Sequence, residues 1–237
     1  ITSTSSEYSD FQYTDDQGTW YFDLIDESGN KVDASTLSST ISRNGASTFA
    51  ASTYASTDNY TAKLNKFAPK DGVTTVIIPK YLGISEDSNK FALTKIDCYN
   101  NSGSGGAFSN LKNITSITIP DSVTSIGNGA FYNYNCSGLE KIEVASGNTK
   151  YHSAGNCLIE TATGNLILGC NSSIIPADGS IFTIESAAFS GCSGLTSITI
   201  PNSVTNIGSS AFSGCSSLTS ITIPDSVTSI DRAVFRD

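Results

Sequence analysis

The side chain best suited to acid–base chemistry is the single histidine, His152, which lies between Tyr151 and Ser153. A Ser-His-Asp hydrolase would have to use this imidazole as its general base. The motif G-x-S-x-G, which presents the attacking serine in many hydrolases, does not accompany it. We therefore predict a surface or hydrogen-bonded structural histidine, no catalytic residues and a protein that is not an enzyme.

Metal and phosphate chemistry would need other residues, and their spacing does not favour it. Asp15 with Asp16 and Glu86 with Asp87 form carboxylate pairs, but neither pair has the D-x-D-x-D-G spacing of a calcium loop. The six cysteines include no C-x-x-C pair. The glycine-rich segment 102–106 lacks the G-K-[ST] ending of a phosphate loop. The sequence thus predicts no metal and no cofactor.

The cysteines recur at one position of a repeated pattern. Cys192 and Cys215 stand 23 residues apart in AFSGCSGL and AFSGCSSL, and Cys136 takes that position in AFYNYNCSGL after an insertion. A side chain that recurs in register usually lies inside a stack of repeats, where a free cysteine packs as a small apolar residue. We expect buried free thiols, with a disulfide between stacked coils as the alternative.

A 23-residue period organises most of the chain. Ala-Phe or Val-Phe pairs end at five phenylalanines with gaps of 23, 58, 23 and 23, at Phe108, Phe131, Phe189, Phe212 and Phe235. The last two units share the frame L-x-x-I-x-I-P-x-x-V-x-x-I-x-x-x-[AV]-F. Periods of this length indicate a solenoid, in which each unit buries its apolar residues only against its neighbours.

Each unit is expected to contain one short strand and a return limb. In residues 195–200 apolar and polar side chains alternate, which is typical of a strand with one buried face. Pro201 ends this strand because it has no N–H for a continuing ladder. Val204 and Ile207 then point inward on the return limb, and Phe212 closes the unit.

The departures from the period predict two further features. Between Phe131 and Phe189, the runs NCLIE and NLILG flank TATG, which predicts an inserted β-hairpin. Residues 72–79 have the same strand pattern as the repeats, but the frame is absent before Asp71. There, aromatic residues around DDQG predict a hairpin that covers the open end of the solenoid. We therefore divide the chain into an N-terminal cap, residues 1–70, and a solenoid, residues 71–237.

The segment ITIPDSVTSIG followed by AF resembles the BspA-like (Treponema-type) leucine-rich repeat family of bacterial surface proteins. The insertion GNTKYHSAGNCLIETATGNLILGC is similar to a long repeat of that family. The resemblance covers residues 71–237. It implies a mostly β, right-handed leucine-rich-repeat solenoid with 23-residue repeats, an inserted β-hairpin and a β-containing N-terminal cap. It also implies a role in adhesion or binding outside the cell.

Charge and hydropathy limit the partners. With 13 basic and 22 acidic residues, most of the surface would repel a nucleic acid. No run of about 18 apolar residues occurs, so we expect no membrane-spanning segment. The Ser/Thr-rich beginning without a methionine favours a chain processed for secretion, although an arbitrary boundary would look the same. Secreted or cell-surface localisation in a bacterium is the expectation.

The repeat builds one regular surface, the outward face of its concave strand ladder. We expect this face to bind a protein or glycan through residues that alternate with buried apolar ones: Ser116, Thr118, Lys141, Glu143, Ser197, Thr199, Ser220 and Thr222. The alternatives are a spacer that holds another domain away from the cell surface, or an enzyme with its site in residues 1–70. We also expect the uncovered last coil to associate with a continuation, a further domain or a second copy of the chain.

Overall fold

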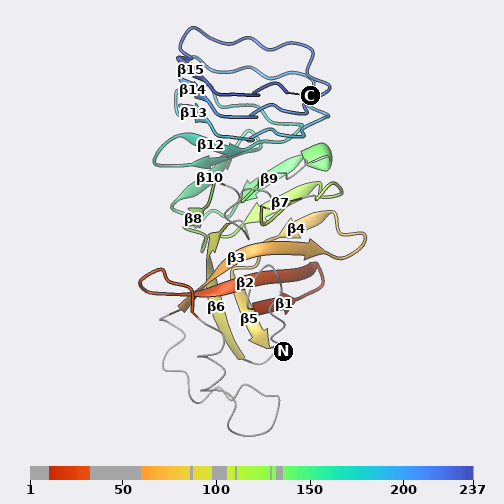
Figure 1. The fold of residues 1–237 in the computed structure, drawn as a ribbon, viewed down its shortest axis with the longest axis vertical. Coiled ribbons are helices and arrows are strands. Elements are labelled where there is room, and N and C mark those ends of the chain that lie inside the picture. The colour runs from red at the N-terminus through yellow and green to blue at the C-terminus, as the bar shows by residue number, and fades with distance from the viewer. Residues whose placement is uncertain are drawn as a thin grey trace, which may run out of the picture.

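The computed structural model describes residues 11–32, 60–85, 88–97, 106–109, 111–128, 130–131 and 136–236, and side chains within these ranges except 83–90 and Cys136. The molecule is an elongated stack, with the N-terminal strands at one end and the last coils at the other (Figure 1). In this part of the chain, no helix is long and apolar enough to cross a membrane. The regular structure is almost entirely β, with one short 3-10 turn, η2, at Cys136–Gly138.

The N-terminal end is a six-stranded sheet. Its order is β1-β2-β3-β6-β5, with β8 paired to β6, and the strands are β1 (Phe11–Thr14), β2 (Gly18–Asp26), β3 (Tyr60–Pro69), β5 (Tyr81–Ser85), β6 (Ser88–Ile96) and β8 (Ser125–Ile126). The hairpin expected around DDQG is confirmed, because β1 and β2 pair antiparallel with Tyr13 opposite Trp20. Since β5, β6 and β8 follow residue 70, the sheet continues across the boundary that we predicted there, and the division into cap and solenoid stays a prediction.

The first solenoid limbs form a parallel sheet of three strands, β4 (Thr75–Ile77), β7 (Ser116–Ile119) and β9 (Lys141–Val144). Ile117 and Ile119 are buried on one face, whereas Ser116 and Thr118 alternate with them on the other. The strand predicted within residues 72–79 is therefore confirmed, and its pleat gives the period-two pattern.

A second ladder runs along the other limb in the order β10-β11-β12-β13-β14-β15. Its strands are β10 (Tyr151–Ala154), β11 (Cys157–Glu160), β12 (Asn165–Leu168), β13 (Thr183–Ile184), β14 (Asn206–Ile207) and β15 (Ser229–Ile230). The predicted insertion hairpin is confirmed as β11 and β12. The additional strand β10 was missed. It joins β11 through Gly155 and Asn156, whose positive φ angles of 55° and 57° suit a two-residue hairpin turn.

The strand expected at residues 195–200 is wrong in position. Ile198 and Ile200 are buried as predicted, but no strand is assigned there, and the strand of that repeat is β14 on the return limb. The insertion explains the change. Above β9, Asn171 N–H donates to Leu139 O, but Ile174 N–H then donates to Gly155 O in the hairpin turn. The backbone is thereby diverted from β9, and among the described residues the first-limb ladder ends at that strand.

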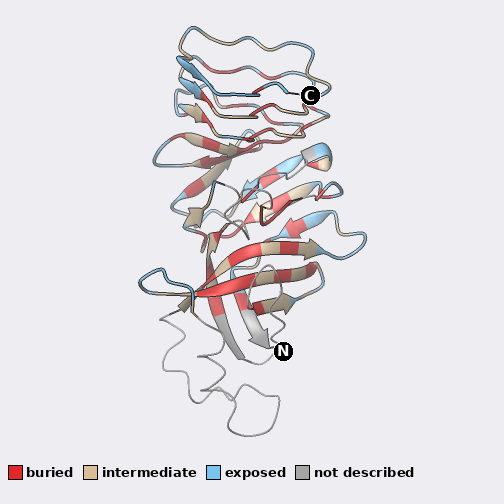
Figure 2. Ribbon diagram, in the orientation of Figure 1, coloured by how far each residue is buried: buried red, intermediate tan, exposed pale blue. Residues whose placement is uncertain are grey.

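The repeated phenylalanines stack in columns through the core. Phe189, Phe212 and Phe235 stack with ring centroids 5.1 and 5.8 Å apart. The lower column continues from Phe131 and Phe108 into Phe67 and Trp20, so the aromatic residues of the N-terminal sheet extend the solenoid core. Figure 2 shows the buried residues running along the interior of the stack. These contacts explain why one unit needs its neighbours.

The described cysteines bear out the prediction of buried free thiols. Cys157, Cys170, Cys192 and Cys215 are free and buried. Burial raises the pKa of Cys157 and that of Cys215 to about 12. Cys98 and the side chain of Cys136 lie outside the described residues.

Candidate binding surface and polar pocket

The three-stranded sheet presents an outward face made of two rows of side chains. Strand register places Thr75, Ser116 and Lys141 in one row and Ile77, Thr118 and Glu143 in the next. Cross-strand neighbours on one face of a parallel sheet lie side by side, so the four predicted residues on β7 and β9 are brought together. Ile77 adds an exposed apolar side chain at the β4 edge of the face, since 58% of it is exposed.

The charges at the edge of this face pair with each other. Lys141 Nζ lies 2.8 Å from Glu143 Oε1, and both side chains are about half exposed, at 56% and 49%. An exposed ion pair contributes about 1 kcal/mol or less to stability. It therefore leaves both groups available to a polar partner at little cost.

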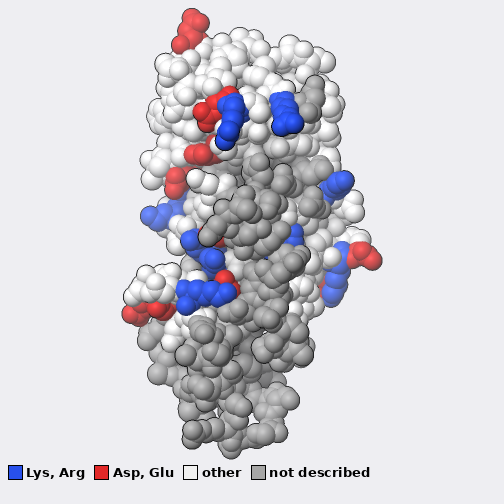
Figure 3. All heavy atoms as spheres, in the orientation of Figure 1, with Lys and Arg blue, Asp and Glu red and all other residues white. Residues whose placement is uncertain are grey.

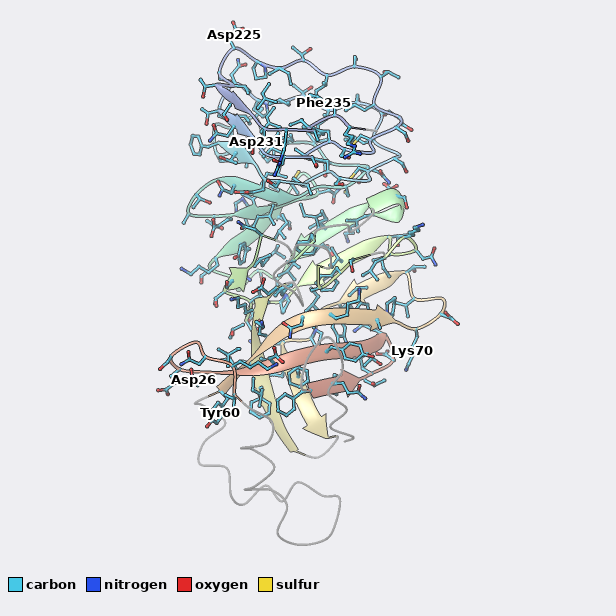
Figure 4. All side chains as sticks on the ribbon, viewed as in Figure 1. Asp26, Tyr60, Lys70, Asp225, Asp231 and Phe235 are labelled. Atoms are coloured by element: carbon cyan, nitrogen blue, oxygen red, sulfur yellow. The ribbon has the colours of Figure 1, made fainter. Side chains whose placement is uncertain are left out.

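The free edge of β4 is covered by the N-terminal sheet. Gln17, in the turn between β1 and β2, donates from Nε2 to Ile77 O at 2.9 Å and accepts from Ile77 N–H at 2.6 Å. Lys70 N–H donates to Gln17 O, and the Lys70 ammonium donates to Asp15 O (Figure 4). The face is thus anchored to the N-terminal sheet at one side.

The other four predicted residues do not extend this sheet. Ser197, Thr199, Ser220 and Thr222 are exposed and recur in successive coils, but none lies in a strand. No backbone hydrogen bond joins residues 195–200 to 218–223 among those described. The structure therefore divides the predicted surface into a sheet part and a separate, irregular part.

The other sequence candidates have local partners where the structure describes them. His152 Nδ1 lies 2.9 Å from the Thr161 hydroxyl, as expected of a hydrogen-bonded structural histidine. Asp15 accepts from the N–H groups of Gln17 and Gly18 and from Trp20 Nε1, which makes it a turn residue. Glu86, Asp87 and residues 102–105 lie outside the described residues.

The sequence reasoning missed a polar pocket beside the insertion. The pocket has a volume of about 160 Å³. It is lined by the end of β8 and the residues after it, the strands β10 to β12 and the residues after β13: Ile126, Gly127, Asn128, Phe131, Tyr151, Glu160, Asn165, Ile167, Glu185, Ser186 and Ala187. No motif marks these residues, because the insertion brings them together from separate coils.

Two carboxylates face this pocket in different settings. Glu160 accepts a hydrogen bond from the Thr163 hydroxyl at 2.6 Å. Burial raises the pKa of Glu185, and the Glu160 charge raises it further, against a backbone hydrogen bond from Ser186 that lowers it. Two carboxylates on one pocket can together attract a cation.

Comparison with known proteins places the repeat in a described family. The BspA type leucine rich repeat region matches residues 88–156 and 165–237, in six copies. No curated protein matches the chain.

Three solved structures are similar to this chain over different shares of its length. A leucine-rich repeat protein from Eubacterium ventriosum is 35% identical, with 49% of this chain and 32% of that chain covered and a TM-score of 0.44. The pneumococcal vaccine antigen PcpA is 13% identical, with 91% and 71% covered and a TM-score of 0.47. A leucine rich cell surface protein from Faecalibacterium prausnitzii is 21% identical, with 98% and 47% covered and a TM-score of 0.41. This chain spans about a third of the first protein and under half of the last.

Proposed function

The chain belongs to the BspA-type leucine-rich repeat family, and from that premise we propose that it is a non-enzymatic binding or adhesion module, secreted or displayed on a bacterial cell surface. Its partner is a protein or a glycan, and its solenoid presents the binding surface. Members of repeat families commonly bind through the extended face that their stacked strands build.

The observation that supports this proposal best is the outward face of β4, β7 and β9. It combines an exposed apolar residue, Ile77, with the hydroxyls of Ser116 and Thr118 and the charges of Lys141 and Glu143. A patch that combines exposed apolar area with hydrogen-bonding and charged groups can bind a protein. Backbone pairing across the sheet fixes the spacing of the residues that carry these side chains, so the backbone of the patch needs no ordering on binding.

Screening of the purified chain against host matrix proteins and a glycan array tests the proposal. Once a ligand is found, Ser116→Lys with Thr118→Lys should weaken its binding at least tenfold. The matched variant, Ser197→Lys with Thr199→Lys, adds the same charge to the irregular part of the predicted surface.

The outcomes separate the versions of the proposal. Loss of binding only in the Ser116 and Thr118 variant assigns the site to the sheet, and loss only in the Ser197 and Thr199 variant assigns it to the irregular part. A ligand that binds both variants normally would contradict the predicted surface. A chain that retains no ligand in either screen would favour the architectural spacer.

A further inference from the structure

The return-limb ladder is interrupted between β8 and β10. Strand β8 pairs with β6 on one side, and β10 is the first strand of the upper sheet. In the break, Ile126 N–H donates to the phenolic oxygen of Tyr151 at 2.8 Å. A side chain here takes the place of a backbone partner, and the space left between the two sheets is the polar pocket of about 160 Å³.

Strand register explains which side chains reach this space. Tyr151 lies opposite Glu160, Glu160 opposite Asn165, and Asn165 opposite Thr183. These neighbours form one row across the outer face of the upper sheet. Glu185 lies two residues beyond Thr183, so it projects from the same face of the sheet. The two carboxylates thus come from β11 and from the end of β13.

The size of the pocket limits its occupant. Ligand pockets for drug-sized molecules are about 300–1,000 Å³, so this one is too small for them. At ~30 Å³ per molecule, it has room for ~5 waters. That space suits a group of a few heavy atoms, such as the end of one long side chain.

The charge of the pocket is uncompensated in the described chain. Neither Glu160 nor Glu185 forms an ion pair with a described residue. The groups that affect the raised pKa of Glu185 are its own burial, Glu160 and the Ser186 backbone, and no cation is among them. Figure 3 shows Asp and Glu atoms over the region of β10 to β13, with Lys and Arg atoms beside the upper ones and below the lower ones. A cation in the pocket would neutralise this charge.

The lining favours an organic cation over a metal ion. Ile126, Phe131, Ile167 and Ala187 supply apolar walls that an alkyl chain can contact. Calcium takes about six to eight oxygen ligands. Among the described residues, no group of three or more His, Cys, Asp or Glu side chains is placed to hold a metal.

We propose that this pocket binds one protonated amine or guanidinium group on a short alkyl chain, as carried by a lysine or arginine side chain of a partner protein. The carboxylates of Glu160 and Glu185 bind the charged group, and the apolar wall binds the alkyl chain. The site lies on the upper sheet, apart from the face of β4, β7 and β9, and it goes beyond the proposed surface-binding function without depending on it.

Titration of the whole chain by isothermal calorimetry and NMR tests this proposal directly. The probes are N-acetyl-lysine methylamide and N-acetyl-arginine methylamide, with N-acetyl-norleucine methylamide as the neutral control and n-butylamine as a free amine. We expect saturable binding of both charged amides with Kd of about 1 mM, and no saturation by the norleucine amide. Tighter binding of n-butylamine than of the two amides would overturn the assignment to a protein side chain.

Neutral variants locate the site. Glu160→Gln and Glu185→Gln should each weaken binding of the charged amides about tenfold, because each removes one charge-assisted hydrogen bond. Glu27→Gln, an equal change at an exposed glutamate after β2 and outside both proposed sites, should leave it unchanged. Equal binding of the norleucine amide, no saturable binding, or binding that survives both pocket substitutions would overturn the proposal. The titration uses small probes and needs no natural ligand. A negative ligand screen therefore counts against the proposed function, whereas a negative titration counts against the pocket.

Discussion

The Gln17 side chain makes with Ile77 both hydrogen bonds that a neighbouring strand would make, since its Nε2 donates to Ile77 O and its Oε1 accepts from Ile77 N–H. One side chain therefore covers the edge of the first solenoid strand, β4, at Ile77. An uncovered edge would offer unpaired backbone groups to other chains. The turn between β1 and β2 thus protects the sheet that carries the proposed binding face.

Replacing Gln17 with alanine should destabilise the chain by about 1–3 kcal/mol, because two hydrogen bonds of about 0.5–1.5 kcal/mol are lost. Calorimetric melting of the purified variant measures this. Gln17→Glu can still accept from Ile77 N–H but can no longer donate to Ile77 O. Comparing the melting temperatures of the Glu and Ala variants therefore separates the contributions of the two hydrogen bonds. A melting temperature equal to that of the parent chain for Gln17→Ala would show that the edge cover contributes nothing.

The repeat holds a non-glycine residue in the left-handed region once in each of three successive units, at Ala187, Ser210 and Ala233, with φ near 60°. This conformation costs an L-residue about 1–2 kcal/mol, and glycine in place of alanine costs about 0.5–1 kcal/mol in chain entropy. Ala187→Gly should therefore stabilise the chain by up to about 1 kcal/mol. Ala188→Gly is the matched control and should destabilise it, since Ala188 is buried and is not among the positive-φ residues. Denaturant unfolding of both variants tests the opposite signs.

The buried thiols make stability fall in alkali. Burial raises the pKa of Cys157 and Cys215 from 9.0 to about 12, so the folded chain keeps protons that the unfolded chain releases. The contribution of the protonated thiols to the free energy of unfolding is complete below pH 9 and is lost as the pH rises from 9 towards 12. Cys157→Ala with Cys215→Ala should flatten this part of the unfolding curve. At pH 8 both thiols should also resist iodoacetamide until the chain is unfolded, as peptide mass spectrometry can show.

Glu185 should reduce stability at neutral pH. Its pKa is raised by burial and by Glu160, so the folded state favours the protonated acid more than the unfolded state does. The resulting destabilisation is absent below the ordinary glutamate pKa and grows as the pH rises through the raised value. Glu185→Gln should therefore raise the melting temperature at pH 7 by about 1–2 °C and leave it unchanged at pH 3.5. A difference of equal size at both pH values would contradict this cause.

The C-terminal coil should associate in this chain. Strand β15 ends the upper sheet, and Ile230 and Phe235 are 52% and 46% exposed in the same coil, where Figure 4 labels Phe235. In the purified chain this edge is open to a second copy. Sedimentation should show self-association that rises with concentration and is lost in Ile230→Lys, whereas Ile174→Lys, at an exposed isoleucine outside the last coil, should leave it intact. A monomer at all concentrations would exclude the contact.

The sequence by itself determined the period, the apolar positions and the insertion. The spacing of 23 residues placed the phenylalanines whose rings stack, and the register of the cysteines favoured buried free thiols over the alternative of a disulfide. These features follow from the sequence because every unit of a stack must repeat the contacts of its neighbours.

Only the tertiary structure decided which limb carries the hydrogen-bonded ladder. The alternating pattern at residues 195–200 indicates a buried face, but a strand also needs a neighbouring strand as its hydrogen-bond partner. The insertion diverts the backbone that would have supplied this partner. The Gln17 edge cover and the pocket around Glu160 and Glu185 have the same origin. Each joins residues from different coils, and their contacts depend on how those coils stack rather than on the residue pattern within any one of them.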